Sequence, residues 1–377
     1  MKQSVLHKVL ESFGESQAKN IIDLTLSSSF IKPKSVIIDS IKDALNDPVI
    51  YTYGVGNYES EYKNEIKLYL HEKYGIKLGQ DNILPCAGTK QIIGHTLFSL
   101  LINDDSVLIP SPGYPAYKNM CEQFKLRFST YDTTGQSDDI AHQIIDKIES
   151  YKPKLIVLNF PCNPTGRCLT TSQYVQIIEK SKEHGVYILH DNILDDFSPN
   201  ENPISLFSLD IYNDMILELS SFSKMHGMSG LRIGCVYGHQ NLLKVIKASR
   251  QIFEFNVPAL SLHAGICALK NRDDSFKDYI FQNMELVENT FIETNTKYIV
   301  PDGGVSILAE IPFDIDSISF CSEFYKYYGV KTLPGIIYGE KHDKYFRVTL
   351  MSLQESLHDF DRLYKNYINK IGGKSND

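Results

Sequence analysis

Apolar and polar positions follow two recurring patterns along the first 270 residues. Short apolar runs rich in β-branched residues predict strands at 82–84, 106–109, 155–160, 186–190, 215–219 and 233–238. Between them, apolar residues at three- and four-residue steps predict helices at 90–101, 117–124, 140–149 and 172–184. This alternation predicts an α/β fold with a mainly parallel central sheet flanked by helices, whose functional groups lie at the carboxyl ends of the strands.

The pattern changes after residue 271. A long helix is predicted at 274–294, followed by strands near 305–311 and 346–350 and helices at 318–328 and 353–370. A further helix at 35–45 precedes the sheet pattern, and we expect it to pack on this C-terminal part. The sequence therefore predicts a large domain at 46–270 and a small α+β domain formed by both chain ends, 1–45 and 271–377.

Length and charge narrow the possible functions. The chain has 377 residues, of which 42% are hydrophobic, enough for two domains. Lys and Arg total 38 against 46 Asp and Glu, and the net charge of −8 repels nucleic acid and anionic membranes. The apolar runs are too short to span a bilayer, and residues 1–7 lack the apolar core of a signal peptide. We therefore expect a cytoplasmic protein that binds neither nucleic acid nor membrane.

The seven cysteines are scattered without a C-x-x-C pair. An odd number in apolar or loop contexts is typical of buried, reduced thiols. We expect neither disulfides nor a metal site.

The segment most informative about chemistry is SSFSKMHGMSGLRIG at 220–234. It places Lys224 just after an apolar strand, with Ser221 and Ser223 beside it and Arg232 beyond a glycine-rich turn. A lysine amine in such a place can form a Schiff base, and the hydroxyls and guanidinium can hold a phosphate. An isolated S-x-S-K would be read as an exposed turn, whereas the extended arrangement favours a catalytic site.

This segment resembles the lysine motif of fold-type I enzymes that use pyridoxal 5′-phosphate (PLP), specifically the class I/II aminotransferases. The similarity extends from about Tyr51 to Arg347, most of the chain. The resemblance implies a large PLP-binding domain with a small α+β domain, and PLP held as a Schiff base on Lys224.

Two further motifs gain a role from this resemblance. LNFPCNPTG at 158–166 ends a strand in a turn that presents Asn163, which alone would mark only the start of that turn. The family's matching Asn contacts the O3′ oxygen of PLP and the substrate. GVYILHDN at 185–192 ends a buried strand at Asp191, whose charge needs a positive partner such as the protonated pyridine nitrogen of PLP. The adjacent His190 faces the opposite side of the strand, where we expect it to pack in the core.

The resemblance also assigns the surroundings of the cofactor. SPGYPAY at 111–117 resembles the family's P-x-Y-P-x-Y element, whose first tyrosine, here Tyr114, stacks on the pyridine ring. Three residues at a strand-to-helix turn are expected to bind the phosphate with Ser221, Ser223 and Arg232: Gly88, Thr89 and Lys90.

Two residues remote from these motifs complete the prediction. Arg347 lies alone in an apolar strand, and the family's matching Arg binds the substrate α-carboxylate. An ion pair with an acidic residue is the alternative for Arg347. Tyr51 resembles the tyrosine that reaches the phosphate in the neighbouring subunit, which implies a homodimer with shared active sites.

The chain departs from the family pattern at two places. Leu194 stands where the family commonly has a tyrosine that donates to O3′. The N-terminal substrate loop LTLSSSF at 24–30 has bulkier and hydroxylated residues in place of glycines, so Ser27 and its neighbours predict a polar or reshaped substrate pocket.

The favoured function is a PLP-dependent aminotransferase of amino acid metabolism, which acts on an amino acid and a 2-oxo acid. The alternative on the same fold is a PLP-dependent lyase or cyclase of amino-acid-derived biosynthesis, motivated by Leu194 and the serine loop. A PLP-binding transcription regulator is disfavoured, because the acidic chain leaves no room for a basic DNA-binding module before the sheet.

Overall fold

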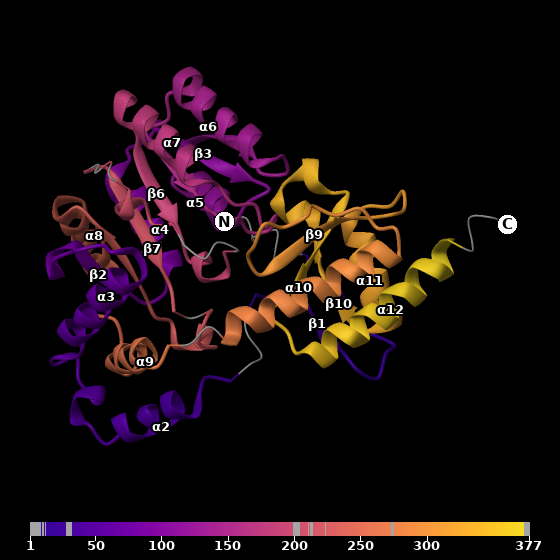
Figure 1. Ribbon diagram of the computed structural model, residues 1–377, viewed down its shortest axis with the longest axis horizontal. Coiled ribbons are helices and arrows are strands. Elements are labelled where there is room, and N and C mark those ends of the chain that lie inside the picture. Colours follow the sequence, from indigo (N-terminus) through magenta and orange to yellow (C-terminus); the bar gives the residue numbers. More distant parts are fainter. Residues whose placement is uncertain are drawn as a thin grey trace.

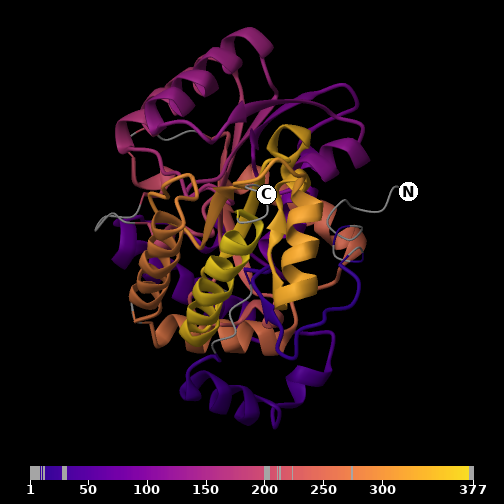
Figure 2. The ribbon, with the colours of Figure 1, turned by 90° about the vertical axis from the view of Figure 1, so that its right-hand side faces the viewer.

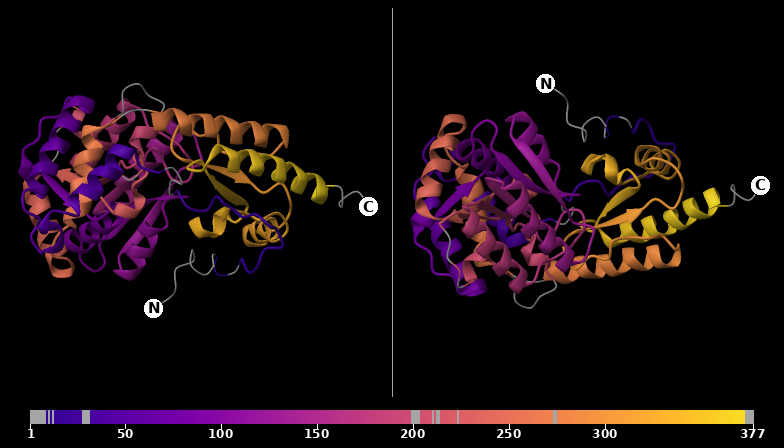
Figure 3. Two further views of the ribbon diagram at one scale, coloured as in Figure 1. Left: turned by 90° about the horizontal axis from the view of Figure 1, so that it is seen from below. Right: turned by 90° about the horizontal axis from the view of Figure 1, so that it is seen from above.

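The computed structural model describes residues 9, 11, 13–27, 32–198, 204–209, 211, 214–222, 224–272 and 275–372. The chain forms a large part around one central sheet, and beside it a C-terminal lobe that carries the C-terminal helix at its outer side (Figures 1 and 3). The boundaries at residues 45 and 270 stay a prediction.

The central sheet has seven strands in the order β2-β8-β7-β6-β5-β3-β4. Only β8 of these strands runs antiparallel to its neighbours, so the predicted, mainly parallel sheet is confirmed. The strands are β2 (Ile83–Cys86), β3 (Ser106–Ser111), β4 (Arg127–Asp132), β5 (Leu155–Leu158), β6 (Tyr187–Asp191), β7 (Ile216–Ser220) and β8 (Gly234–Gly238).

Successive residues of these strands bury into opposite faces of the sheet. Leu155 and Val157 pack with one helix layer, whereas Ile156 and Leu158 pack with the other. The first layer comprises α4 (Thr89–Leu100), α5 (Ala116–Gln123) and α8 (Gln240–Phe253). The second comprises α6 (Ser137–Tyr151) and α7 (Thr171–His184), with α3 (Tyr58–Tyr74) and α9 (Ala259–Lys270) over β2 and β8. Both faces of the sheet are therefore covered, as Figure 1 shows.

The C-terminal lobe contains a three-stranded antiparallel sheet in the order β11-β12-β9. Its strands are β9 (Ser306–Glu310), β11 (Leu333–Pro334) and β12 (Tyr345–Thr349), and its helices are α10 (Ser275–Glu293), α11 (Ser317–Tyr328) and α12 (Gln354–Gly372). The three helices lie side by side in Figure 2. Aromatic rings such as Phe291, Phe320 and Phe346 fill the space between them and the sheet.

The N-terminal segment joins both parts of the molecule. β1 (Ile22–Asp23) pairs in parallel with β10 (Val330–Lys331), which attaches the start of the chain to the C-terminal lobe. Helix α2 (Ser35–Ala44) was expected on that lobe, and this expectation is wrong. It packs on α9 instead, where Ile37 joins the core and Ser40 Oγ lies 2.7 Å from His263 Nε2. Ile37 of α2 belongs to one apolar cluster with Leu262 and Ile266 of α9, so the apolar face of α2 is buried on the large part of the molecule.

Candidate active site

A cavity of about 430 Å³ lies at the carboxyl ends of the parallel strands, between the central sheet and the C-terminal lobe. In α/β proteins with a parallel sheet, ligands commonly bind at this edge of the sheet. Most of the predicted site residues line it: Ser27, Gly88, Thr89, Lys90, Tyr114, Asn163, Asp191, Ser221, Lys224, Arg232 and Arg347.

The other two predicted residues are Ser223 and Tyr51. Ser223 lies outside the described residues. Tyr51 ends the short 3-10 helix Pro48–Tyr51, is 74% exposed, and donates its hydroxyl to the backbone oxygen of Leu45. Its role across a subunit boundary stays a prediction.

Lys224 follows β7 and extends its amine toward the N-terminal loop. Nζ donates a hydrogen bond to the backbone oxygen of Ser27. Burial, together with the charges of Arg347 and Arg232, lowers the pKa of the Lys224 amine to about 8. A larger fraction of this amine is therefore neutral near physiological pH than for an exposed lysine, which is the form that attacks a carbonyl.

Asp191 is the last residue of β6 and is buried. Burial raises the pKa of its carboxyl to about 6, although a hydrogen bond from Tyr117 and the charge of His190 both act to lower this pKa. Tyr117 donates to Oδ2, while Oδ1 is buried without a hydrogen-bond partner. A buried carboxylate with one vacant acceptor oxygen is suited to a cationic N–H donor.

Gly88 and Arg232 meet where α4 begins. Gly88 precedes α4 with a φ of 88°, and a Cβ atom added there would collide with the guanidinium of Arg232. Arg232 also has a positive φ of 52° and donates from Nη1 to the backbone oxygen of Ser229 at 2.9 Å. The free amides of the α4 N-terminus and this guanidinium therefore face the same part of the cavity.

Asn163 and Arg347 form the side of the cavity nearest the C-terminal lobe. Arg347 on β12 donates from Nη1 to Asn163 Oδ1 at 3.1 Å and from Nη2 to the backbone oxygen of Thr25, and its Nε is buried without a partner. Among the described residues, its hydrogen bonds go to neutral oxygens and not to a carboxylate. The ion-pair alternative for Arg347 is therefore not supported.

The turn that carries Asn163 is fixed by contacts with the lobe. Gly166 has a φ of 70°, and a side chain there would collide with Pro301 and with the backbone of Gly303. Its carbonyl accepts the backbone N–H groups of Asp302 and Gly303, each at 3.0 Å. This close backbone approach explains why glycine ends the N-P-T-G sequence.

Several lining residues were not predicted. Tyr117 was part of the quoted tyrosine motif, and a spacing of three residues from Tyr114 on a helical turn could have indicated that both face one site. Thr25 and Leu26 belong to the N-terminal loop that was expected to shape the substrate pocket, whereas Tyr338 was not predicted; all three reach the cavity from segments far away in sequence. Leu194 also lines the cavity and is buried in the core of the C-terminal lobe, so an apolar surface stands where the family commonly has a hydroxyl.

The features of the cavity fit PLP. The vacant oxygen of Asp191 matches a protonated pyridine nitrogen, the space beside Gly88 matches a phosphate, and the amine of Lys224 matches the aldehyde. Residues 23–361 also match the family described as aminotransferase class I and II. The chain belongs to this family. It is a PLP-dependent aminotransferase, and the substrates of such enzymes are amino acids and 2-oxo acids.

Individual aminotransferases are similar over nearly the whole chain. The LL-diaminopimelate aminotransferase of Maridesulfovibrio salexigens is 25% identical over 342 residues, covering 89% of this chain and 88% of that protein. Transaminase BacF of Bacillus subtilis is 25% identical over 368 residues, covering 94% and 90%.

Solved structures share the fold-type I architecture. Substrate-bound BacF superposes with a TM-score of 0.84 at 21% identity, covering 97% of this chain and 94% of that one. A probable N-succinyldiaminopimelate aminotransferase from Thermus thermophilus gives a TM-score of 0.85 at 22% identity, covering 96% and 100%. In addition, none of the described helices has the length and apolar character needed to cross a membrane.

Proposed function

We propose that this aminotransferase binds PLP through Lys224 and moves an amino group from an amino acid to a 2-oxo acid in the cavity described above. The observation that carries the proposal is the convergence of three groups on one cavity: an amine of lowered pKa, a buried carboxylate with a vacant oxygen, and a buried guanidinium. Bound PLP withdraws electrons from the substrate's α-carbon and thereby weakens its C–H bond.

The remaining residues orient the cofactor in this proposal. Asp191 pairs with the pyridine nitrogen, and Tyr114 offers its ring to one face of the cofactor. Asn163 donates its amide to the O3′ oxygen. Binding of the phosphate is assigned to Gly88, Thr89, Lys90, Ser221, Ser223 and Arg232.

Lys224 has a second task as a proton carrier. Once the substrate amine has replaced it, Nζ is free to take the proton from the substrate's α-carbon. The pKa of about 8 suits both steps, because a group titrating near the working pH can accept and return a proton. Arg232 and Arg347 repel positive charge on Nζ and thus favour its return to the neutral form.

Arg347 is proposed to bind the α-carboxylate of the substrate. Its Nε is buried without a partner, and its two Nη groups donate to the neutral oxygens of Asn163 and Thr25, so the guanidinium has donors to offer a carboxylate. The next part of the wall is largely apolar, with Leu26, Val305 and Ile337 beside the oxygens of Ser27 and Tyr338. Because several relatives are named LL-diaminopimelate aminotransferases, diaminopimelate belongs in a substrate screen with the common amino acids.

The active unit is proposed to be a homodimer. A set of exposed apolar side chains, the Phe253 surface, includes the predicted inter-subunit tyrosine; its members are Tyr51, Tyr53, Phe98, Ile252, Phe253 and Phe255. Ring contacts join Tyr53 to Phe255 at 5.7 Å and Phe98 to Phe253 at 6.1 Å. Five of these six side chains are at least 68% exposed, and such a concentration is typical of an interface with another protein. A second copy of this chain would cover it and bring Tyr51 to the partner's phosphate site.

A cytoplasmic location is proposed as well. All seven cysteines of the chain are free, and two of them, Cys168 and Cys267, are only partly buried. Reduced thiols persist where glutathione and thioredoxin keep the compartment reducing.

Incubation of the PLP-loaded enzyme with single amino acids, in the absence of a 2-oxo acid, tests the reaction. The expected product is a stoichiometric amount of pyridoxamine phosphate together with the 2-oxo acid of the donor, and a second 2-oxo acid should restore PLP. Release of ammonia without pyridoxamine phosphate would instead support a lyase and contradict the proposal.

A further inference from the structure

We propose that Glu218 and His190 are a positioning pair, which keeps Asp191 ionised and correctly oriented toward the pyridine nitrogen of the cofactor. Neither residue lines the cavity, and both act through Asp191. The inference rests on the proposed role of Asp191 and adds two residues to it.

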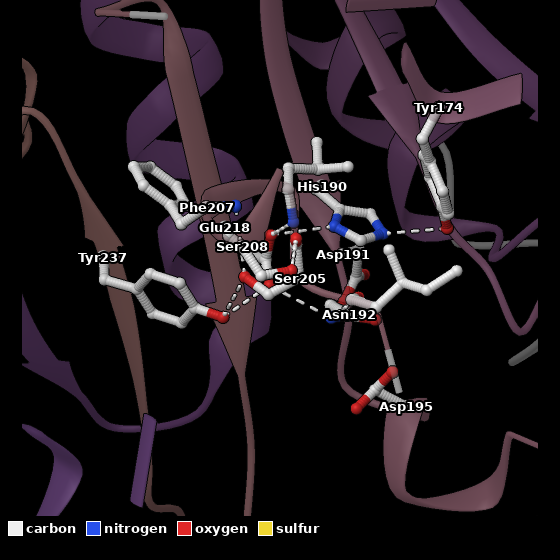
Figure 4. A network of polar contacts seen from close by, with 12 residues as sticks. Tyr174, His190, Asp191, Asn192, Asp195, Ser205, Phe207, Ser208, Glu218 and Tyr237 are labelled. Atoms are coloured by element: carbon white, nitrogen blue, oxygen red, sulfur yellow. Dashed lines mark hydrogen bonds and ion pairs between the residues drawn. The ribbon is translucent and has the colours of Figure 1, made fainter. Parts of the chain in front are cut away.

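The sheet places the pair directly behind Asp191. His190 and Glu218 are register partners on the paired strands β6 and β7, so their side chains lie on the same face. Asp191 follows His190 on β6 and therefore points to the other face, toward the cavity. Both members of the pair have no exposed surface, and Figure 4 shows Glu218 between Tyr237 and His190.

Glu218 is held as a carboxylate. Oε1 accepts from the Tyr237 hydroxyl and from Asn192 Nδ2 at 3.0 Å. Oε2 accepts from the backbone N–H of Leu206 at 2.8 Å and pairs with His190 Nδ1 at 3.1 Å. Burial by itself would raise the pKa of Glu218, yet the charge of His190 and these hydrogen bonds hold the pKa below its ordinary value.

A buried carboxylate also needs a counter-charge, and His190 is its ion-pair partner among the described residues. Both ring nitrogens of His190 have partners, Nδ1 with Glu218 and Nε2 with the Tyr174 hydroxyl at 3.3 Å. The surroundings thus accommodate an imidazolium, which donates from both nitrogens. Its positive charge lies one residue from Asp191 and acts to lower the pKa of that carboxyl.

Further hydrogen bonds hold the chain at Asp191 and at the residue that follows it. Glu218 accepts from Asn192, the next residue along the chain, and Asn159 Nδ2 donates to the backbone oxygen of Asp191 at 2.9 Å. The carboxylate of Asp191 is thereby held at the end of β6 with Oδ1 free. The titratable groups that face this arrangement from the neighbouring elements are Tyr114, Tyr117, Tyr174, Tyr237 and Cys235. The four tyrosines and the thiol have raised pKa values, chiefly through burial, and stay neutral, so the charge balance rests on Asp191, His190 and Glu218.

Replacement of the charge with little change of shape tests the inference. In Glu218→Gln, the imidazole loses its counter-charge, and Asp191 then loses the positive charge behind it. We expect the pH below which apoenzyme fails to bind PLP to move up by about one unit, so that the dissociation constant near that pH rises about tenfold. Tyr131→Phe is the matched control, because it removes a different buried hydrogen bond, to Val157 O, from the same sheet. An unchanged PLP-binding profile in folded Glu218→Gln, or an equal shift in Tyr131→Phe, would overturn the proposal.

A second measurement does not depend on that variant folding. In ¹⁵N spectra of histidine-labelled wild-type apoenzyme, the signals lost in His190→Gln identify the imidazole of His190. Nδ1 is expected to carry a proton directed at Glu218 and Nε2 a proton directed at the Tyr174 hydroxyl, and a ring that lacks either proton would contradict the pairing. If wild-type protein fails to bind PLP at all, the proposed function itself is wrong; if it binds PLP but His190 is neutral, only this inference is.

Discussion

The hydroxyl of Tyr117 donates a hydrogen bond to Oδ2 of Asp191, and the other oxygen of this buried carboxylate has no partner. Oδ1 is therefore available to one more hydrogen-bond donor. The hydrogen bond from Tyr117 acts to lower the pKa of Asp191, yet burial keeps this pKa raised, at about 6. A cationic N–H donor placed at Oδ1 would satisfy the carboxylate and favour its ionised form.

The raised pKa of Asp191 makes the stability of the apoprotein depend on pH. The carboxyl binds its proton more tightly in the folded chain, with a pKa of about 6, than at its ordinary value of 3.8. Its contribution to stability is therefore complete below 3.8 and is lost as the pH rises through about 6. Relative to Asp191→Asn, the wild-type free energy of unfolding should fall by about 3 kcal/mol over this range. Urea unfolding of both apoproteins measures the difference, with exposed Asp104→Asn as the control; a constant difference would contradict the burial of an ionising Asp191.

Loss of the guanidinium fork at Arg347 should weaken substrate binding and leave the cofactor in place. In Arg347→Lys, one ammonium cannot reproduce two parallel N–H donors, and we expect kcat/KM for the amino donor to fall about 10- to 100-fold. The absorbance of bound PLP should be unaltered. Arg272→Lys, at a surface ion pair with Glu72, serves as the control. Equal losses in the two variants, or loss of PLP from Arg347→Lys, would argue against a carboxylate-binding role.

A side chain at Gly88 should disturb the phosphate site. Gly88→Ala places a Cβ against the guanidinium of Arg232 at a residue whose φ is 88°, so PLP affinity should drop about tenfold or more. Gly185→Ala separates this effect from backbone strain alone. Gly185 also has a positive φ, of 64°, but it has open space around it at the end of α7. A PLP titration that gives the same dissociation constant for both variants would contradict the placement of the phosphate.

The Phe253 surface should be buried in solution. Wild-type protein is expected to sediment as a dimer, whereas Phe253→Glu should shift it toward monomer, because a charge cannot be desolvated in an apolar interface without a partner. The monomer should also bind PLP more weakly, since it lacks Tyr51 of the partner subunit. Ile292→Glu, at another exposed apolar residue on α10, is the control. A monomeric wild-type enzyme with full activity would exclude the shared site.

Local patterns in the sequence predicted most of the sheet and the motif residues. The runs at 155–160 and 186–190 are apolar on both faces, and buried parallel strands require this. Strand β4 was missed because it lies at the sheet edge, where the exposed polar residues of RFSTYD hide its period. Helix α2 was assigned to the wrong partner, because amphipathic periodicity shows that a face is buried and not what covers it.

The part of the site that the sequence could not indicate depends on pairing between strands. His190 was expected to pack in the core, and it is buried, but its partners are polar: Glu218 and Tyr174. Glu218 is a single charged residue in an apolar run. Its importance follows from the register of β6 and β7, which places it opposite His190. Arg347 and Asn163 were each predicted separately, and only the fold shows that they share a hydrogen bond.

Reduction of the PLP-loaded enzyme with borohydride shows which lysine holds the cofactor. The reagent converts a lysine-bound PLP into a stable secondary amine, and mass spectrometry of the digested protein then locates the added group. We expect the label on the peptide containing Lys224, and Lys224→Ala, loaded and reduced in the same way, should carry none at that position. A label on another lysine, or no label on wild-type protein that holds PLP, would contradict this expectation.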